Sequence, residues 1–333
     1  MATGSTKSTR RPPTIWRRSA ASIGLAALAF GGAFSVAARA AARESEAATA
    51  FPAMGQLVPV GRGHVHAHMQ GQGRDLVLIH GASGNTRDFT FRLAGELARD
   101  FRVTAFDRPG LGWSTDLGDD GIDPAAQARA LAQAARDLGI ERPVVLGQSY
   151  GGAVALAWGL EAADILPPAA LVLVSAAAMP WEGGLGLRYD FLSSRLGLAT
   201  ALPLAAAFVN DTIITREIEG IFAPEPVPEG YGTYIGAGLS LRRAVMRANL
   251  LQVAGLKPHL HRMALRYPDL SIPVEMVHGT ADAIVPPQIH AHPLLRLLPD
   301  ARLDMIEGAG HMPHHTRPDR VAAAILRATG RSS

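Results

Sequence analysis

The most constraining feature of the chain is the pentapeptide Gly147-Gln148-Ser149-Tyr150-Gly151, which stands between an apolar run at 143–146 and a helix-like stretch at 152–163. In a G-x-S-x-G turn between a strand and a helix, the serine adopts a strained conformation that exposes its hydroxyl at the sheet edge. The two glycines allow the strand and the helix to approach closely. The pentapeptide therefore predicts a nucleophile at Ser149, although so short a motif also occurs in ordinary turns.

Strands and helices alternate along much of the remaining chain. Continuous apolar runs fit strands that are buried on both faces of a sheet. Such runs occupy residues 76–79, 144–146 and 170–174, and further strands are expected at 103–106, 273–277 and 301–306. Helical spacing follows, for example at 122–138, where Asp123 is expected to be the N-cap and Pro124 the first helical residue. This order predicts an α/β fold with a parallel sheet covered by helices on both faces.

The alternation stops between residues 179 and 270, where Leu, Ala and Gly dominate. We expect this segment to be a helical cap or lid, inserted over the sheet edge at which open α/β sheets bind ligands. Residues 57–178 and 271–333 would then form the α/β core. A chain of 333 residues is long for one compact domain, which fits a single large domain with an insertion.

The first 43 residues differ from the rest in charge. They hold seven of the 32 basic residues and none of the 29 acidic ones, so the remainder is slightly acidic and no nucleic-acid surface is indicated. Residues 19–38 are uncharged and follow Arg17-Arg18, the layout of an export signal or of a marginal membrane anchor. We expect an exported, periplasmic or membrane-anchored protein, with membrane association through 19–38 and a linker at 44–56. Cleavage of residues 1–43 and a cytoplasmic location both remain open.

The chain has no cysteine, which excludes thiolate metal sites and leaves histidines and carboxylates as candidate ligands. His64, His66 and His68 alternate and would share one strand face, but no carboxylate joins them, so we favour a polar row facing solvent. His314 and His315 are interpreted as a solvated approach to the last helix. We therefore predict no metal and no cofactor.

Three groups suited to nucleophilic catalysis follow three separate predicted strands, namely Ser149, Asp282 and His311. A serine hydroxyl needs an imidazole to accept its proton during attack, and a carboxylate must fix the tautomer of that imidazole. The chain order of serine, acid and histidine is that of α/β-hydrolases and differs from that of chymotrypsin and subtilisin.

Five motifs in this order resemble the α/β-hydrolase superfamily, in particular its capped branch of epoxide-hydrolase-like and haloperoxidase-like proteins. They are HGASGN at 80–85, DRPGLGWS at 107–114, GQSYGG at 147–152, HGTADAIVP at 278–286 and GAGHMP at 308–313. The resemblance covers residues 57–329 and implies a mostly parallel eight-stranded sheet with an inserted helical cap. It also implies Ser149 as nucleophile, His311 as general base, Asp282 as its orienting acid, and an oxyanion hole made by the amides of Ala82 and Tyr150.

Epoxide hydrolases and haloalkane dehalogenases carry aspartate at the elbow, whereas this chain carries Ser149 there. The resemblance therefore indicates acyl transfer. We predict a serine hydrolase that cleaves a small, fairly apolar acyl substrate, such as an ester, thioester or lactone, with Trp113 and Trp181 as candidate walls of the substrate pocket. A cofactor-free haloperoxidase or perhydrolase, or a carbon-carbon bond hydrolase, would use the same triad. A non-catalytic ligand-binding module is the alternative from a different class. The specific substrate and the oligomeric state stay open.

Overall fold

The computed structural model describes residue 1 and residues 15–330, with side chains from residue 31 onward. Its core is one sheet with the strand order β1-β2-β4-β3-β5-β6-β7-β8. The strand β2 pairs antiparallel with β1 and β4, and all pairs from β4 to β8 are parallel. The strands are β1 (Gln56–Val60), β2 (Gly63–Gln70), β3 (Arg74–Ile79), β4 (Phe101–Phe106), β5 (Val144–Gln148), β6 (Ala170–Val174), β7 (Val274–Gly279) and β8 (Ala301–Ile306). The mostly parallel eight-stranded sheet is confirmed.

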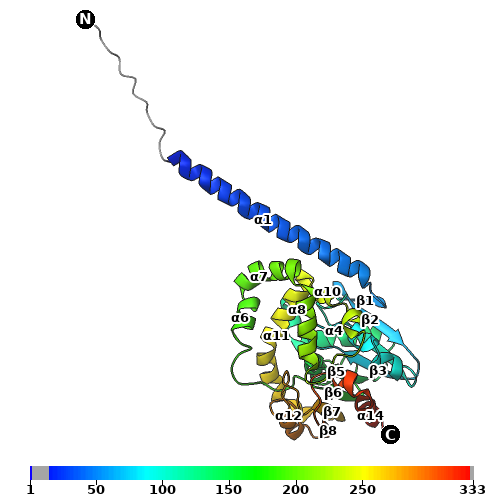
Figure 1. The fold of residues 1–333 in the computed structure, drawn as a ribbon. Helices are drawn as coiled ribbons and strands as arrows, with labels where there is room; N and C mark the ends of the chain where they lie inside the picture. Colours follow the sequence, from blue (N-terminus) through cyan, green and yellow to red (C-terminus); the bar gives the residue numbers. More distant parts are fainter. Residues whose placement is uncertain (2–14, 331–333) are drawn as a thin grey trace.

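Helices cover both faces of this sheet (Figure 1). Successive residues of a strand point to opposite faces. Val145 accordingly packs in the apolar cluster that α4 and α5 cover, and Leu146 in the cluster beneath α14. Asp123 caps α4 by accepting the Ala125 amide at 2.9 Å, as predicted. The core helices are α2 (Arg87–Thr90), α3 (Leu93–Leu97), η1 (Gly118–Ile122), α4 (Pro124–Asp137), α5 (Tyr150–Glu161), α12 (Ala291–Leu297), α13 (Pro313–Thr316) and α14 (Pro318–Ala328).

Between β6 and β7 the chain is helical, and we refer to residues 179–270 as the cap. The long helix α11 joins the cap to the core, because Leu256, Leu260 and Met263 on one side of it enter the same apolar cluster as α4 and α5. The cap consists of α6 (Leu187–Ser193), α7 (Arg195–Phe208), α8 (Asp211–Phe222), α9 (Tyr231–Tyr234), α10 (Ala237–Ser240), α11 (Arg243–Ala264) and η2 (Tyr267–Asp269).

The N-terminal segment forms one helix, α1 (Ile15–Ala50), which projects from the body and lies with its C-terminal part across α7 and α10 (Figure 1). Residues 44–50, expected to be linker, are its last turns. The difference has a packing cause, since Ala47 is buried and Glu44 forms an ion pair with Arg243 of the cap at 2.7 Å. Residues 2–14 of the expected signal or anchor segment lie outside the described residues.

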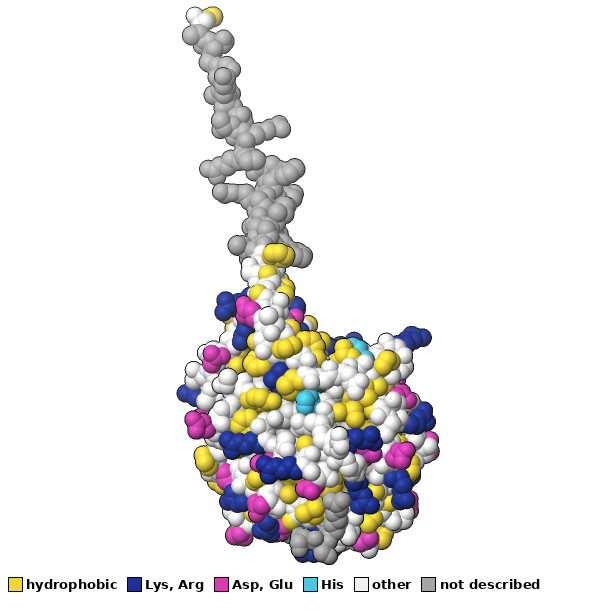
Figure 2. Space-filling view, turned by 90° about the vertical axis from the view of Figure 1, so that its right-hand side faces the viewer, with side chains coloured by type: hydrophobic (Ala, Val, Ile, Leu, Met, Phe, Trp, Pro, Cys, Tyr) yellow, Lys and Arg dark blue, Asp and Glu magenta, His cyan; other side chains and the backbone are white. Residues whose placement is uncertain are grey.

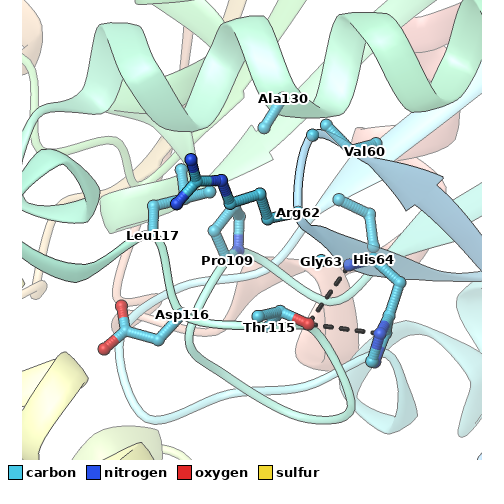
Figure 3. A pocket seen from close by; sticks show the side chains of 11 residues that line it. Val60, Arg62, Gly63, His64, Pro109, Thr115, Asp116, Leu117 and Ala130 are labelled. Atoms are coloured by element: carbon cyan, nitrogen blue, oxygen red, sulfur yellow. Dashed lines mark hydrogen bonds between the residues drawn. The ribbon is translucent and has the colours of Figure 1, made fainter.

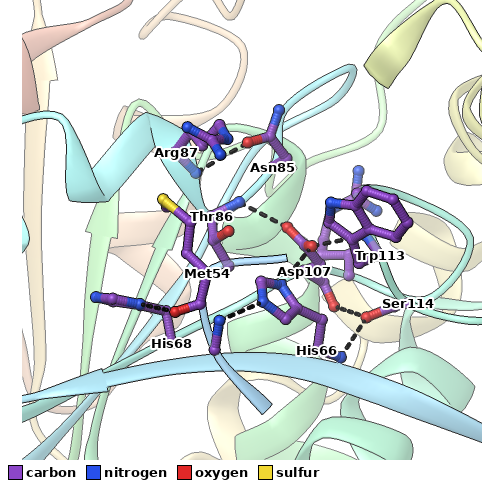
Figure 4. Close-up of polar contacts among 12 residues, drawn as sticks. Met54, His66, His68, Asn85, Thr86, Arg87, Asp107, Trp113 and Ser114 are labelled. Carbon is purple, nitrogen blue, oxygen red and sulfur yellow. Dashed lines mark hydrogen bonds and ion pairs between the residues drawn. The ribbon is translucent and has the colours of Figure 1, made fainter. Parts of the chain in front are cut away.

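The histidines of β2 do not form a solvent-facing row, and this interpretation is wrong above all for His66. Its strand lies between β1 and β4, and its side chain is buried. His66 Nδ1 donates to Asp107 Oδ2 at 2.7 Å, while its Nε2 accepts the Gly55 amide at 3.1 Å (Figure 4). Asp107 also accepts the amides of Thr86 and Trp113. Burial raises the pKa of Asp107, but the hydrogen bond and charge of His66 outweigh it and leave the pKa below its ordinary value.

Candidate active site

Ser149 lies at a sharp turn between β5 and α5, with φ of +52° and ψ of −118°. A positive φ is strained for a residue with a side chain, and such strain is found preferentially at functional sites. The turn is tight enough to require both flanking glycines, because a Cβ on Gly147 would overlap the carbonyl of Gly151, and one on Gly151 would overlap that of Ile79. The sequence therefore folds into the strained elbow that its pentapeptide predicted.

Asp282 and His311 meet on the loops that follow β7 and β8. His311 Nδ1 lies 2.8 Å from Asp282 Oδ2, and both side chains are buried. The other carboxylate oxygen accepts the amides of Ile284 and Val285 at 2.9 Å each. This hydrogen bonding fixes the carboxylate in one orientation, which is what an acid that orients an imidazole requires.

The charge on Asp282 is maintained by its partners. Burial raises the pKa of its carboxyl, but hydrogen bonds from His278 and His311 and the charge of His311 outweigh burial and hold the pKa well below its ordinary value. His278 also contacts this carboxylate, with its Nε2 3.3 Å from Asp282 Oδ2 and 2.7 Å from the carbonyl of Val285. The carboxylate is thus ionised at neutral pH.

The end of β5 contacts the loop that carries His311. Since Nδ1 of His311 faces a carboxylate, we assign the proton to Nδ1 and leave Nε2 as the basic nitrogen. The side-chain nitrogen of Gln148, the residue before Ser149, lies 3.4 Å from this Nε2 and 3.4 Å from the backbone oxygen of His311. Gln148 is a site residue that belongs to the motif, but its role could not be predicted from the motif alone.

The two predicted oxyanion-hole amides flank Ser149. Tyr150 is the first residue of α5, so its N–H lacks an acceptor within the helix. Ala82 follows Gly81, and a Cβ on Gly81 would lie 3.0 Å from that of Ser149. Both segments are therefore close to the serine, and the assignment of these two amides to an oxyanion hole stays a prediction.

A buried arginine fixes the loop that contains Ala82. Arg108 donates to the carbonyls of His80 and Gly81 at 3.0 and 3.1 Å, and its guanidinium lies 4.2 Å from the ring centre of Tyr150. It also donates to Gln127 of α4 and Gln252 of α11. Burial lowers the pKa of Arg108 to about 10. Arg108 thus joins the loop, the elbow helix and the cap, a role that the DRPG motif did not reveal.

The two tryptophans considered as pocket walls have other contacts. The indole N–H of Trp113 donates to the carbonyl of Phe51 at 3.1 Å, and the Arg242 guanidinium lies 4.9 Å from its ring centre. The ring centre of Trp181 lies 6.2 Å from that of His290. These contacts explain why both side chains are held in place, and a role in binding substrate stays a prediction for each.

A surface pocket of about 280 Å³ lies away from these groups, between the turn that joins β1 and β2 and the loop after β4 (Figure 3). None of the three candidate catalytic groups lines it. The lining residues are Val60, Gly61, Arg62, Gly63, His64, Val65, Pro109, Thr115, Asp116, Leu117 and Ala130. We assign no catalytic role to this pocket.

His314 and His315 are buried, so the interpretation of a solvated helix approach is wrong. Their Nε2 atoms lie 3.1 and 2.8 Å from the two oxygens of Asp88, and the Tyr231 hydroxyl donates to the same carboxylate at 2.8 Å. One ligand atom from each of Asp88, His314 and His315 lies within 4.8 Å of the others, close enough to hold a metal ion. However, among the described residues both Nδ1 atoms lack a partner, whereas a metal-bound histidine normally donates its second N–H. The contacts fit a hydrogen-bonded junction between cap and core.

Tyr231→Phe is expected to weaken this junction. The change removes one hydroxyl donor from a buried carboxylate and leaves the ring packing on Phe222 and Phe91 intact. We expect the free energy of unfolding to fall by about 1.5–3 kcal/mol, the usual worth of a hydrogen bond to a charged group. Urea denaturation measures the loss. Tyr234→Phe, whose hydroxyl bonds the neutral Thr90, serves as the matched control and should cost less; an equal cost in both variants would contradict the assignment.

Acidification below pH 6.5 is expected to destabilise the protein through its buried histidines. Burial, as the largest cause, lowers the pKa of His80, His290 and His314 from 6.5 to about 4. Between pH 6.5 and 4 the unfolded chain therefore binds protons that the folded protein does not, and stability falls as pH falls. The limit is about 1.4 kcal/mol per pH unit for each histidine.

Urea denaturation at pH 7, 6, 5 and 4.5 measures this dependence. The variant His290→Asn, whose side-chain oxygen can keep the bond from the Met179 amide, should show a shallower slope. A free energy of unfolding that stays constant across this range would contradict the depressed histidine pKa values.

Known proteins share both the sequence pattern and the fold. The model of the alpha/beta hydrolase family matches residues 76–324. The magnesium-chelatase 30 kDa subunit of Rhodobacter capsulatus is 29% identical over 75% of this chain and 85% of its own length. The pimeloyl-[acyl-carrier protein] methyl ester esterase of Vibrio vulnificus is 26% identical over 80% of this chain and 98% of its own. Among solved structures, a bacterial membrane phospholipase A superposes with a TM-score of 0.63 at 20% identity, covering 94% of this chain and 98% of that one.

Proposed function

Since the chain belongs to the alpha/beta hydrolase family and is a hydrolase, we propose that it cleaves a small, fairly apolar acyl substrate through an acyl-enzyme on Ser149. One observation carries the proposal. The strained elbow at Ser149 contacts the His311 imidazole through Gln148, and Nδ1 of that imidazole is hydrogen-bonded to the buried carboxylate of Asp282. An activated serine nucleophile needs this arrangement of base and orienting acid.

The chemistry proceeds in two halves. The Ser149 hydroxyl attacks the acyl carbonyl while Nε2 of His311 takes its proton, and the ionised Asp282 stabilises the resulting imidazolium. The amides of Tyr150 and Ala82 would stabilise the negative charge on the carbonyl oxygen. His311 then gives the proton to the leaving group, and water attacks the acyl-enzyme by the same route in reverse.

The substrate class is supported by the relatives and by the cap. The Vibrio relative is named for the cleavage of a methyl ester, and the phospholipase A for an acyl ester of a lipid. Leu, Ala and Gly dominate the cap, which suits an apolar acyl group. We therefore propose carboxylic esters ahead of the peracid, halogenation or carbon-carbon reactions that the same triad could perform.

Turnover of p-nitrophenyl esters with acyl chains of two to twelve carbons tests the proposal. We expect hydrolysis with an optimum at short or medium chain length, and release of p-nitrophenol in an initial burst if deacylation is slow. Parallel assays for perhydrolysis with acetate and peroxide, and for cleavage of a diketone, address the other reactions. No turnover of any ester, with activity in either parallel assay, would contradict ester hydrolysis.

A further inference from the structure

The C-terminal half of α1 is built into the cap. Arg39 Nε donates to the carbonyl of Ala207 at 2.9 Å, and Arg43 Nη1 donates to that of Ala206 at 3.1 Å. Guanidinium groups at these positions satisfy carbonyls at the end of α7 that have no partner within the helix. Ala40 is fully buried between them. Cleavage after the small residues of Ala38-Arg39-Ala40 would remove Arg39 and Ala40 from a packed interface, so the contacts favour a helix that is retained.

An exposed apolar surface adjoins this interface. Leu196, Leu204 and Phe208 stand on α7 at spacings of four and eight residues, so they share one side of the helix. Their exposed fractions are 63%, 49% and 54%. On the preceding helix α6, Leu187 and Phe191 are exposed as well. We call these five side chains the cap patch; large apolar side chains that are exposed together mark a binding surface.

The cap patch and α1 are continuous. The Arg39 guanidinium lies 5.2 Å from the ring centre of Phe208, so α1 leaves the body beside the end of the patch. Beyond this point the sequence is uncharged over residues 19–38, and Phe34 is largely exposed. Lys7, Arg10, Arg11, Arg17 and Arg18 precede the uncharged run. An apolar segment with a basic flank is suited to a bilayer with anionic lipids.

The geometry of α6 and α7 favours a cap patch that lies on the surface of a membrane over a helix pair that crosses the membrane. Among the described residues no single helix is long and apolar enough to span a bilayer, whereas the pair α6 and α7, bent by 93°, passes by length and composition. The side of α7 opposite the patch is buried in the cap, through Leu202 and Ala206. Only one side of α7 is therefore available to lipid. Figure 2 shows the opposite side of the body from α6, where hydrophobic side chains are frequent next to the helix and charged side chains of both signs are spread over the remainder.

We propose that the cap patch rests on a phospholipid bilayer into which the N-terminal part of the retained helix α1 inserts. The contacts of Arg39, Arg43 and Glu44 would hold the cap at a fixed orientation to the membrane, with α14 and the C-terminal end of the chain directed away from it (Figure 1). The proposal concerns binding and does not depend on catalysis.

Because the chain has no cysteine, a single cysteine introduced by substitution is the sole thiol available for labelling in the full-length protein. Leu204→Cys and Phe34→Cys report on the patch and the helix, and Leu265→Cys, 83% exposed at the end of α11, is the matched control. Each variant carries an environment-sensitive fluorophore and is reconstituted with vesicles of phosphatidylethanolamine and phosphatidylglycerol. Quenching by spin-labelled lipids is then measured.

We expect a blue shift and several-fold quenching at positions 204 and 34, with neither at 265. Quenching at 34 without quenching at 204 would overturn the proposal, since the cap would then stand off the membrane. The fluorophore at position 204 could instead show a blue shift without quenching by the spin-labelled lipids, while analytical ultracentrifugation shows dimers. That result would also overturn the proposal, in favour of a second copy of the chain bound to the cap patch. An intact mass that lacks residues before Ala40 would contradict the retained helix.

Discussion

Replacement of Ser149 by Ala is expected to lower kcat for ester hydrolysis by at least about 10⁴-fold, because the variant retains the oxyanion hole and the pocket but has no nucleophile. The thermal unfolding midpoint should stay close to that of the wild type. Alanine keeps the Cβ, so the strain at a φ of +52° and the packing of the elbow are unchanged. Steady-state kinetics and a thermal melt of the same preparation measure both quantities.

Ser175 provides a matched control for this prediction. It too follows a parallel strand, β6, is buried and has a positive φ, of 45°. Its hydroxyl has no hydrogen-bond partner among the described residues. Ser175→Ala should therefore keep wild-type kcat. Loss of activity in Ser175→Ala, with activity retained in Ser149→Ala, would place the nucleophile elsewhere.

Replacement of Asp282 by Asn is expected to lower kcat by about 10³–10⁴-fold with little effect on KM. The amide oxygen can still accept the Ile284 and Val285 amides, which preserves the loop. The NH₂ group would then face Nδ1 of His311, so the imidazole would carry its proton on Nε2 and could not accept one from serine. Stopped-flow and steady-state assays with the best ester from the panel measure kcat and KM separately. A variant within tenfold of wild-type kcat would show that Asp282 does not orient the base.

The sequence predicted the sheet and the order of the candidate site because both follow from local patterns. A strand buried on both faces must be apolar at every position, and residues 170–174 and 144–146 meet that demand without any tertiary information. Side chains that follow parallel strands gather at one sheet edge, which brings together the loops after β5, β7 and β8.

Burial of polar side chains could not be predicted in this way. His66 and His314 lie in segments whose local pattern also fits exposed positions, and each is buried because a carboxylate distant in sequence, Asp107 or Asp88, accepts its N–H. The docking of α1 on the cap depends likewise on a contact across 168 residues, between Arg39 and Ala207. Gln148 was visible in the motif, but its contact with His311 depends on the loop after β8.

Labelling with a fluorophosphonate probe tests the central claim most directly, because the probe reacts covalently with activated serines and needs no knowledge of the substrate. The folded full-length protein, its Ser149→Ala variant and its Asp282→Asn variant are labelled in parallel, and the modified peptide is identified by mass spectrometry. We predict one adduct on Ser149 in the wild type, none in Ser149→Ala and much slower labelling in Asp282→Asn. A folded wild-type protein that stays unlabelled, or that is labelled on another serine, would contradict the account.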